Sequence, residues 1–164
     1  MIIGHGDIAT VLPDRDGFCF FASGVSNSKE SRESEYEREE ALLLSQPKDH
    51  RLVYFSSLAV FLNPTTRYAK HKRHMEELVK KTFPHYTILR IGNISWGNNP
   101  HTFINYFKQK KLNGEPFEMW DTYRFVIEQE EFLSWIELIP DWNCEINMSG
   151  TRMKVTEIVK RYVK

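Results

Sequence analysis

Residues 51–57, RLVYFSS, and residues 87–93, TILRIGN, decide the fold, and one helical segment lies between them. Two apolar runs of this length, separated by a helix, predict neighbouring parallel strands of an α/β sheet. Ligands of such sheets bind at the carboxyl ends of the strands. We therefore expect Ser56, Ser57 and Asn93, at the ends of the two runs, to lie at a binding site.

The helical segment between the strands carries Tyr68 and Lys72, which are four residues apart and share one helix face. An unperturbed phenol has a pKa near ~10, too high for a base that works near neutrality. An adjacent ammonium favours the phenolate, and the Ser57 hydroxyl would favour it further or hold a substrate oxygen. A Tyr-x-x-x-Lys pattern alone is weak, because Tyr68 can also be a core-edge aromatic residue and Lys72 a solvated charge.

The wider context favours the catalytic interpretation. LVYFSSLAVF, TRYAKHKRHMEELV and YTILRIGNISWG, in this order, resemble the extended short-chain dehydrogenase/reductase superfamily, the NAD(P)-dependent epimerases, dehydratases and reductases of nucleotide sugars. The resemblance implies that Ser57 is the catalytic hydroxyl and Tyr68 the catalytic base and acid. It implies that Lys72 holds the nicotinamide ribose and that Asn93 faces the substrate. NAD or NADP is the implied cofactor, and a nucleotide sugar is the implied small-molecule substrate.

The N-terminus reads MIIGHGDIA, a very short strand followed by Gly-x-Gly-x-x-Ala. Small residues there permit a sharp turn and let backbone amides approach a pyrophosphate at a helix N-terminus. The next apolar run, GFCFFASG (residues 17–24), resembles the superfamily's fourth strand, whose end lies against the cofactor. The expected cofactor-binding residues are Gly4, Gly6, Asp7, Ile8, Ala22, Ser23 and Gly24, together with Tyr68 and Lys72.

The chain departs from the superfamily between these two segments, where residues 9–17 leave room for only one short helix and a turn. The usual second and third strands are missing. The acidic residue that holds the adenosine ribose, expected roughly 20 residues beyond the glycines, is missing with them. We therefore predict a truncated Rossmann-like, doubly wound parallel sheet of about five strands. Residues 1–164 are expected to form a single domain, with residues 97–140 as a reduced substrate-binding part.

Two helices are expected to flank the strand at 51–57. KESRESEYEREE (residues 29–40) holds nine charges, three positive and six negative, and indicates a solvated helix face, with residues 41–44 as its buried end. A docking surface is the alternative. The segment from Thr66 to Thr82 is the second helix, on which His71 and His74 indicate a wet basic face. The resemblance implies that these two helices pack against a second copy, which makes a homodimer.

The segment TYRFVIEQEEFL (residues 122–133) resembles the superfamily segment in which an arginine meets the substrate phosphate. Arg124 suits bidentate phosphate binding, although it can equally be an exposed structural arginine. The six histidines and two cysteines have no metal-ligand spacing, so no metal site is expected.

Composition excludes some classes of partner. Lys+Arg and Asp+Glu number 22 each, so no overall basic field favours nucleic acid or an anionic membrane surface. No apolar stretch approaches the ~18 residues of a membrane span, and we expect a cytoplasmic protein.

Two functions stay open at this point. The first is an NAD(P)-dependent enzyme that transfers hydride at a sugar carbinol, with Tyr68, Lys72 and Ser57 as its working residues. The second is a degenerate relative without turnover that serves as a nucleotide-binding or interaction module. The missing strands favour the second function, and the intact Ser, Tyr and Lys favour the first.

Overall fold

The main sheet has five strands, and all of them run parallel. In order across the sheet they are β1 (Ile2–Ile3), β2 (Phe18–Phe21), β3 (Arg51–Ser57), β4 (Tyr86–Ile91) and β7 (Cys144–Met148). The computed structural model describes residues 1–164. The predicted fold class, a truncated Rossmann-like parallel sheet, is confirmed.

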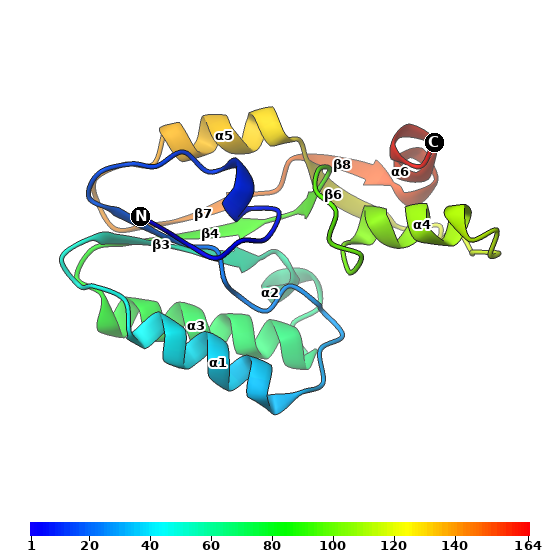
Figure 1. Cartoon of the computed structure of the whole chain (residues 1–164). Coiled ribbons are helices and arrows are strands. Elements are labelled where there is room, and N and C mark those ends of the chain that lie inside the picture. Colours follow the sequence, from blue (N-terminus) through cyan, green and yellow to red (C-terminus); the bar gives the residue numbers. More distant parts are fainter.

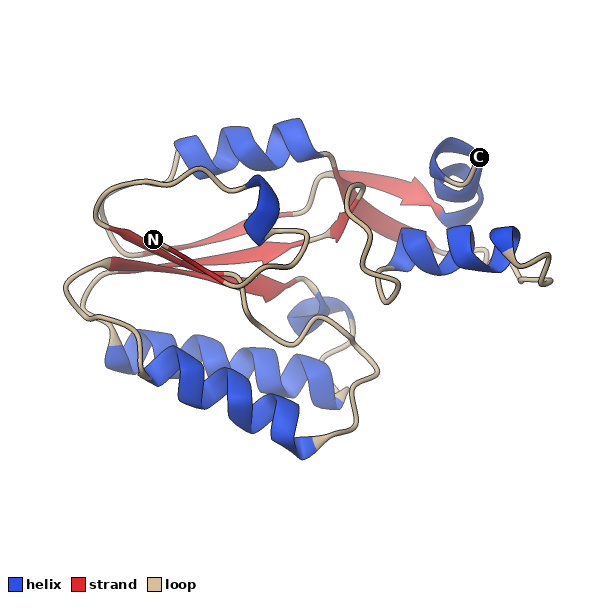
Figure 2. Cartoon of the chain, in the orientation of Figure 1, coloured by secondary structure: helices blue, strands red, loops and turns tan.

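Helices cover both faces of this sheet (Figures 1 and 2). On one face lie α1 (Glu33–Leu44) and α3 (Arg67–Thr82), and on the other lies α5 (Gln129–Glu137). The one-turn helix α2 (Ala59–Leu62) follows β3 directly. The Thr66 side chain accepts a hydrogen bond from the Ala69 amide and so caps the start of α3. None of the helices has the length and apolar character needed to cross a membrane.

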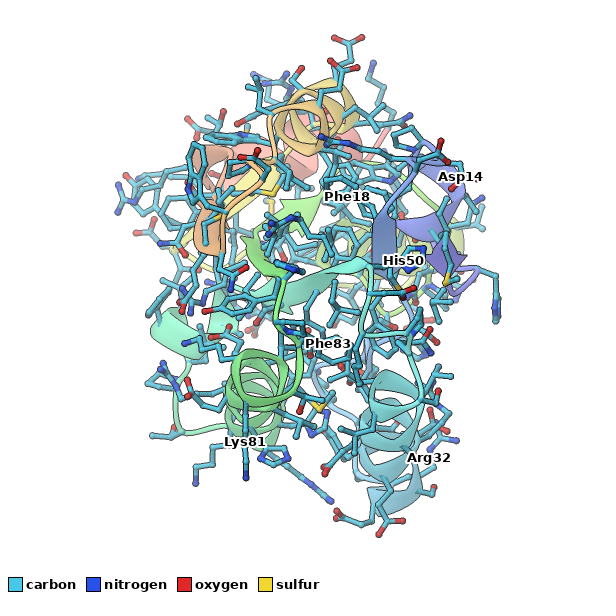
Figure 3. All side chains as sticks on the ribbon, turned by 90° about the vertical axis from the view of Figure 1, so that its left-hand side faces the viewer. Asp14, Phe18, Arg32, His50, Lys81 and Phe83 are labelled. Carbon is cyan, nitrogen blue, oxygen red and sulfur yellow. The ribbon has the colours of Figure 1, made fainter.

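The strands at the centre of the sheet are apolar on both faces, as expected when a sheet lies between two helix layers. Val53, Phe55 and Leu89 face the layer of α5, and Tyr54 and Ile88 face the layer of α1 and α3. The alternation follows from the two-residue period of a strand. Figure 3 looks along the sheet and shows α1 and α3 side by side beneath it, with Phe83 between the helix layer and the strands.

A buried ion pair also ties α3 to the sheet. Glu76, on α3, accepts hydrogen bonds from the Arg90 guanidinium at 2.8 Å and 2.6 Å, and another from the Ser56 hydroxyl at 2.6 Å. Arg90 also contacts Glu145 on β7. The hydrogen bonds that Arg90 donates to Glu76 raise the pKa of Arg90. Glu76 and Arg90, which are both buried, therefore join α3 to β4, with Ser56 on β3 and the exposed Glu145 on β7 as further partners.

A short loop completes the core where two strands are missing. Between β1 and β2, residues 4–17 contain only the three-residue 3-10 helix η1 (Ala9–Val11), as the sequence predicts. Leu12 is buried in the same cluster as Phe20 and Ile136, and Ile8 and Val11 pack beside it. The loop thus covers the face of the sheet that α5 leaves open. It also leaves β1 as an edge strand.

A second, three-stranded sheet adjoins the first at Gly92 and was not predicted. Its strands are β5 (Asn93–Ile94), β6 (Tyr123–Ile127) and β8 (Thr151–Lys154), where β5 and β6 are parallel and β8 is antiparallel. Helices α4 (Phe103–Leu112) and α6 (Val155–Tyr162) pack against it. Gly150 lies in the turn between β7 and β8 and has φ of +69°, which favours glycine. A Cβ there would also lie 2.2 Å from the Val126 carbonyl oxygen.

The role of the loop at residues 4–17 can be tested at Leu12. We expect Leu12→Ala to lower the free energy of unfolding by about 2–5 kcal/mol, because it opens a cavity in the core. The matched control is Leu138→Ala, since Leu138 is 72% exposed and its truncation should change stability by less than about 0.5 kcal/mol. Urea unfolding followed by circular dichroism measures both. Equal effects of the two substitutions would show that the loop is not part of the core.

Candidate functional site

A cleft of about 1040 Å³ lies at the carboxyl ends of β2, β3 and β4. Its walls come from the glycine turn, the loop after β2, the start of α3 and the second sheet. The structure brings together all but one of the predicted site residues around it: Gly6, Asp7, Ile8, Ala22, Ser23, Gly24, Ser57, Tyr68, Lys72, Asn93 and Arg124. The parallel strands explain this, because their carboxyl ends meet at one edge.

Gly4 is the exception and does not line the cleft. It has φ of +118°, and a Cβ there would lie 2.5 Å from the Ala22 carbonyl oxygen. The glycine is required because the ends of β1 and β2 approach each other closely, and its expected contact with a cofactor stays a prediction. Gly6 differs, because a Cβ at Gly6 would meet no atom within 4 Å.

Ser57, Tyr68 and Lys72 approach the cleft from β3 and α3. Ser57 is the last residue of β3, and its Oγ accepts a hydrogen bond of 3.1 Å from the Ala59 amide, which leaves the hydroxyl proton for another acceptor. The Lys72 ammonium lies 5.8 Å from the centre of the Tyr68 ring. Tyr68 is half-buried, whereas Lys72 is only 2% exposed. The alternative interpretation of Lys72 as a solvated charge is therefore wrong.

Lys72 is held by a carboxylate that the sequence did not indicate. Its Nζ donates to Glu39 Oε1 at 2.9 Å and to the Tyr54 hydroxyl at 3.2 Å. Burial is the largest single influence and lowers the pKa of Lys72, but the charges of Glu39 and Tyr68 and the hydrogen bond to Glu39 together outweigh it, and the net shift of the pKa is upward. The Lys72 ammonium thus stays charged although its side chain is almost fully buried.

Glu39 lies in the charged run that was expected to be a solvated helix face, and there the expectation is wrong. Its side chain is fully buried, and its Oε2 accepts hydrogen bonds from the Val25 amide and from His71. His71 is therefore not part of a wet basic face, although His74 is exposed. The apolar end of α1 is also only partly buried, since Leu43 is covered and Leu44 is 42% exposed.

The glycine turn differs from the expected pyrophosphate cradle. The turn leads into three residues of 3-10 helix, so no long helix presents its N-terminus. The Asp7 carboxylate lies at the turn and accepts hydrogen bonds from the Asn98 and Asn99 amides at 3.0 Å and 2.9 Å. A Cβ at Gly97, which has φ of +89°, would overlap the Asp7 side chain. Asp7 therefore fastens the loop after β5 over the turn.

This arrangement does not fit a diphosphate at the turn. A carboxylate there repels phosphate oxygens, and a single 3-10 turn adds little of the dipole that a long helix supplies. The sheet also ends at β1, so no strand beyond it offers a residue to an adenosine ribose. The expected contacts of Asp7 and Ile8 with the cofactor stay a prediction, and the Asp7 carboxylate disfavours a diphosphate beside it.

The opposite wall of the cleft comes from the second sheet and α4. The Asn93 amide nitrogen donates to the Phe125 carbonyl oxygen at 2.9 Å, so this nitrogen links β5 to β6 instead of facing a ligand. Arg124 is half-buried, with its guanidinium 5.4 Å from the centre of the Phe103 ring. Sequence reasoning missed the aromatic residues beside Arg124, which are Phe103, Tyr106 and Trp120. All three lie within residues 97–140, the expected substrate-binding part, and this grouping could have indicated them.

Known proteins resemble this chain in structure only. No protein-family model matches the sequence, and no curated protein matches it. UDP-N-acetylglucosamine 4-epimerase from Methanobrevibacter ruminantium has TM-score 0.60 and 20% identity over 94% of this chain and 61% of that one. UDP-glucose 4-epimerase from Thermus thermophilus, in complex with NAD, has TM-score 0.66 and 16% identity over 88% and 60%.

A reductase has the same fold as well. dTDP-4-dehydrorhamnose reductase from Bacillus anthracis, in complex with NADP, has TM-score 0.68 and 17% identity over 88% of this chain and 61% of that one. This chain spans 55–61% of the length of such structures. The resemblance to extended short-chain dehydrogenases/reductases therefore holds for the fold, in a shortened version.

Proposed function

We propose that this chain binds the nicotinamide end of NAD or NADP and transfers hydride at a carbinol of a nucleotide-linked sugar. The observation that carries the proposal is the convergence of Ser57, Tyr68 and Lys72 on one cleft at the carboxyl edge of the sheet. The fold supports it, because NAD-dependent epimerases and an NADP-bound reductase share that fold.

The chain's own residues would manage the proton. A nicotinamide ring, when bound, accepts or supplies the hydride. In the oxidation direction, the Tyr68 phenolate takes the proton of the sugar hydroxyl. The hydride leaves the carbon atom that carries this hydroxyl. In the reverse direction, the Tyr68 phenol returns that proton to the carbonyl oxygen. The Ser57 hydroxyl donates a hydrogen bond to this oxygen in both directions.

Cofactor binding would be uneven along the dinucleotide. An ammonium has three N–H donors, and Lys72 uses two of them on Glu39 and Tyr54. The third N–H is left for a ribose hydroxyl. The open space at Gly6 leaves room for the dinucleotide to pass. The adenosine half meets the Asp7 carboxylate and the edge of the sheet. We therefore assign tight contacts to the nicotinamide half alone.

The substrate would lie against the second sheet. A guanidinium is suited to phosphate oxygens, and aromatic faces are suited to a flat base. Arg124 together with Phe103, Tyr106 and Trp120 offers both to the cleft. This combination favours a nucleotide-linked sugar over a free one.

A second candidate is a nucleotide-binding or interaction module without turnover. The Asp7 contacts with Asn98 and Asn99 favour it, since a carboxylate fixed at the glycine turn weakens dinucleotide binding. The covered and charged state of Lys72 favours an enzyme, because such a group has a use in proton transfer.

The catalytic proposal predicts the effect of removing the Tyr68 hydroxyl. Tyr68→Phe should leave the fold intact and lower turnover by at least ~10² to 10⁴, the usual scale of general acid–base assistance. Turnover can be followed by nicotinamide absorbance with a panel of nucleoside diphosphate sugars. Tyr86→Phe, at the opposite end of β4, is the control and should keep full activity. Unchanged turnover of Tyr68→Phe would remove Tyr68 from the mechanism.

The uneven binding predicts weak discrimination between the two dinucleotides. No strand lies beyond β1 to offer an acidic residue to the adenosine ribose or a basic residue to a 2′-phosphate. We expect affinities for NAD and NADP within about tenfold, a difference of ~1.4 kcal/mol. Isothermal calorimetry measures both. A preference of a hundredfold or more would contradict the assignment, and binding of neither would favour the module without turnover.

We also propose that the chain is a homodimer formed through α1 and α3. The outer face of α1 is acidic, with Glu33 and Glu37 exposed, whereas that of α3 is basic, with Lys70 and Lys81 exposed. A two-fold axis can place α1 of each copy against α3 of the other and bring these charges together twice. Light scattering should therefore report a dimer at micromolar concentration that weakens as salt rises. A monomer at low salt would contradict it.

A further inference from the structure

Glu39 is the most fully engaged side chain near the cleft. Its Oε1 accepts hydrogen bonds from the Tyr54 hydroxyl at 2.6 Å and from Lys72 at 2.9 Å, and its Oε2 from the Val25 amide at 2.7 Å and His71 at 3.0 Å. A carboxylate has about four acceptor positions, so all of them are filled. The donors come from the loop after β2, from β3 and from α3.

The surroundings are shaped for the Glu39–Lys72 ion pair. A Cβ at Gly24 would lie 2.6 Å from Lys72 Nζ and 2.8 Å from Glu39 Oε1. Gly24 lies at the cleft wall and has no positive φ, so a larger residue there would press on the ion pair and would not strain the backbone. The backbone at Gly24 thus lies close to the Lys72 ammonium, which Glu39 holds by a hydrogen bond of 2.9 Å.

Stability alone explains this arrangement poorly. Burying two charges costs about as much as their attraction returns, and an apolar pair of similar volume is often as stable. The ion pair keeps a charged N–H at the floor of a cleft, which an apolar pair cannot do.

We propose that Glu39 is the positioning residue of this site: it holds the Lys72 ammonium, charged and immobile, with one N–H directed to the ribose of the bound cofactor. The proposal rests on the proposed function for the identity of that ligand. Glu39 itself touches neither cofactor nor substrate.

The groups that set the charge of Lys72 come from several elements. Glu39 and Arg38 lie on α1, Tyr54 on β3, and Tyr68 and His71 on α3. Burial and Arg38 lower the pKa of Lys72, and Glu39 with Tyr68 raises it. Without the Glu39 charge, burial is the largest remaining influence, so the pKa of Lys72 falls below its ordinary value of 10.5.

The test compares Glu39→Gln with the wild type, using protein that carries ¹³C-labelled lysine. The Lys72 Cε resonance, assigned from Lys72→Met, reports the protonation of its ammonium. We expect the Lys72 pKa to fall by at least one unit in Glu39→Gln. Glu40→Gln is the matched control, since Glu40 is adjacent and pairs with the exposed His74 at 3.0 Å. It should leave Lys72 unchanged.

A second readout separates positioning from a structural role. The affinity for NADH, measured by fluorescence, should be nearly constant with pH in the wild type between pH 6 and the ordinary lysine range. In Glu39→Gln it should fall at least tenfold as pH rises through the lowered pKa of Lys72, and it should recover on return to acid. If Glu39→Gln does not fold, Glu39→Asp can be used. Its shorter side chain keeps the negative charge but places it farther from Lys72, so the Lys72 pKa should fall by a smaller amount.

The outcomes are distinct. A Lys72 that titrates identically with and without the Glu39 carboxylate overturns the role of Glu39. A shift of the Lys72 pKa without any pH dependence of NADH affinity also overturns it, because the pair is then structural only. A wild-type chain that binds no NADH overturns the proposed function instead, and the Lys72 titration is still measured independently.

Discussion

The parallel pairing of β3 with β4 is the constraint on which the rest of this structure depends. Register places Ser57 beside Ile91, so the segment after each strand emerges at the same edge of the sheet. The helix that joins the two strands must return over one face, and its first turns then lie against that edge. Tyr68 and Lys72 reach the cleft for this reason. Both faces of this strand pair are buried. A slip of one residue in register would turn Val53 toward the layer of α1 and α3 and Tyr54 toward the layer of α5.

In a sheet this narrow, α5 alone does not cover the apolar side chains on its face of the sheet. Leu12 and its neighbours in the loop at residues 4–17 supply the apolar surface that a helix and two further strands supply in a longer sheet. The solution has a consequence for ligands. The same loop carries Asp7, whose carboxylate is needed to fasten the loop after β5. The loop at residues 4–17 therefore completes the core and fastens the loop after β5, but the Asp7 carboxylate that it carries disfavours a diphosphate at the same place.

The layer of α1 and α3 contains two buried ion pairs, Glu39 with Lys72 and Glu76 with Arg90. They differ from the surface pairs of the same helices, which water and salt screen and which contribute little. Each buried pair is matched by neutral donors, such as Tyr54 for the first and Ser56 for the second. Removing one member of such a pair is costly because the other is left charged and without a partner. The two pairs thus fix how α1 and α3 sit on the sheet.

The sequence by itself determined the parallel sheet and the residues that meet at its edge, because apolar runs and glycines act over a few neighbouring residues, and its resemblance to the superfamily determined the shortened N-terminal part. It also predicted α3 almost to the residue, since the expected helix from Thr66 to Thr82 differs from the observed Arg67–Thr82 by one residue. Only the tertiary structure decided that Glu39 leaves the solvated face of α1, that Asp7 serves a loop distant in sequence, and that β8 returns to pair with β6. Each of these depends on a partner that lies far along the chain. A local pattern of residue types carries no information about which distant donor will meet a given carboxylate.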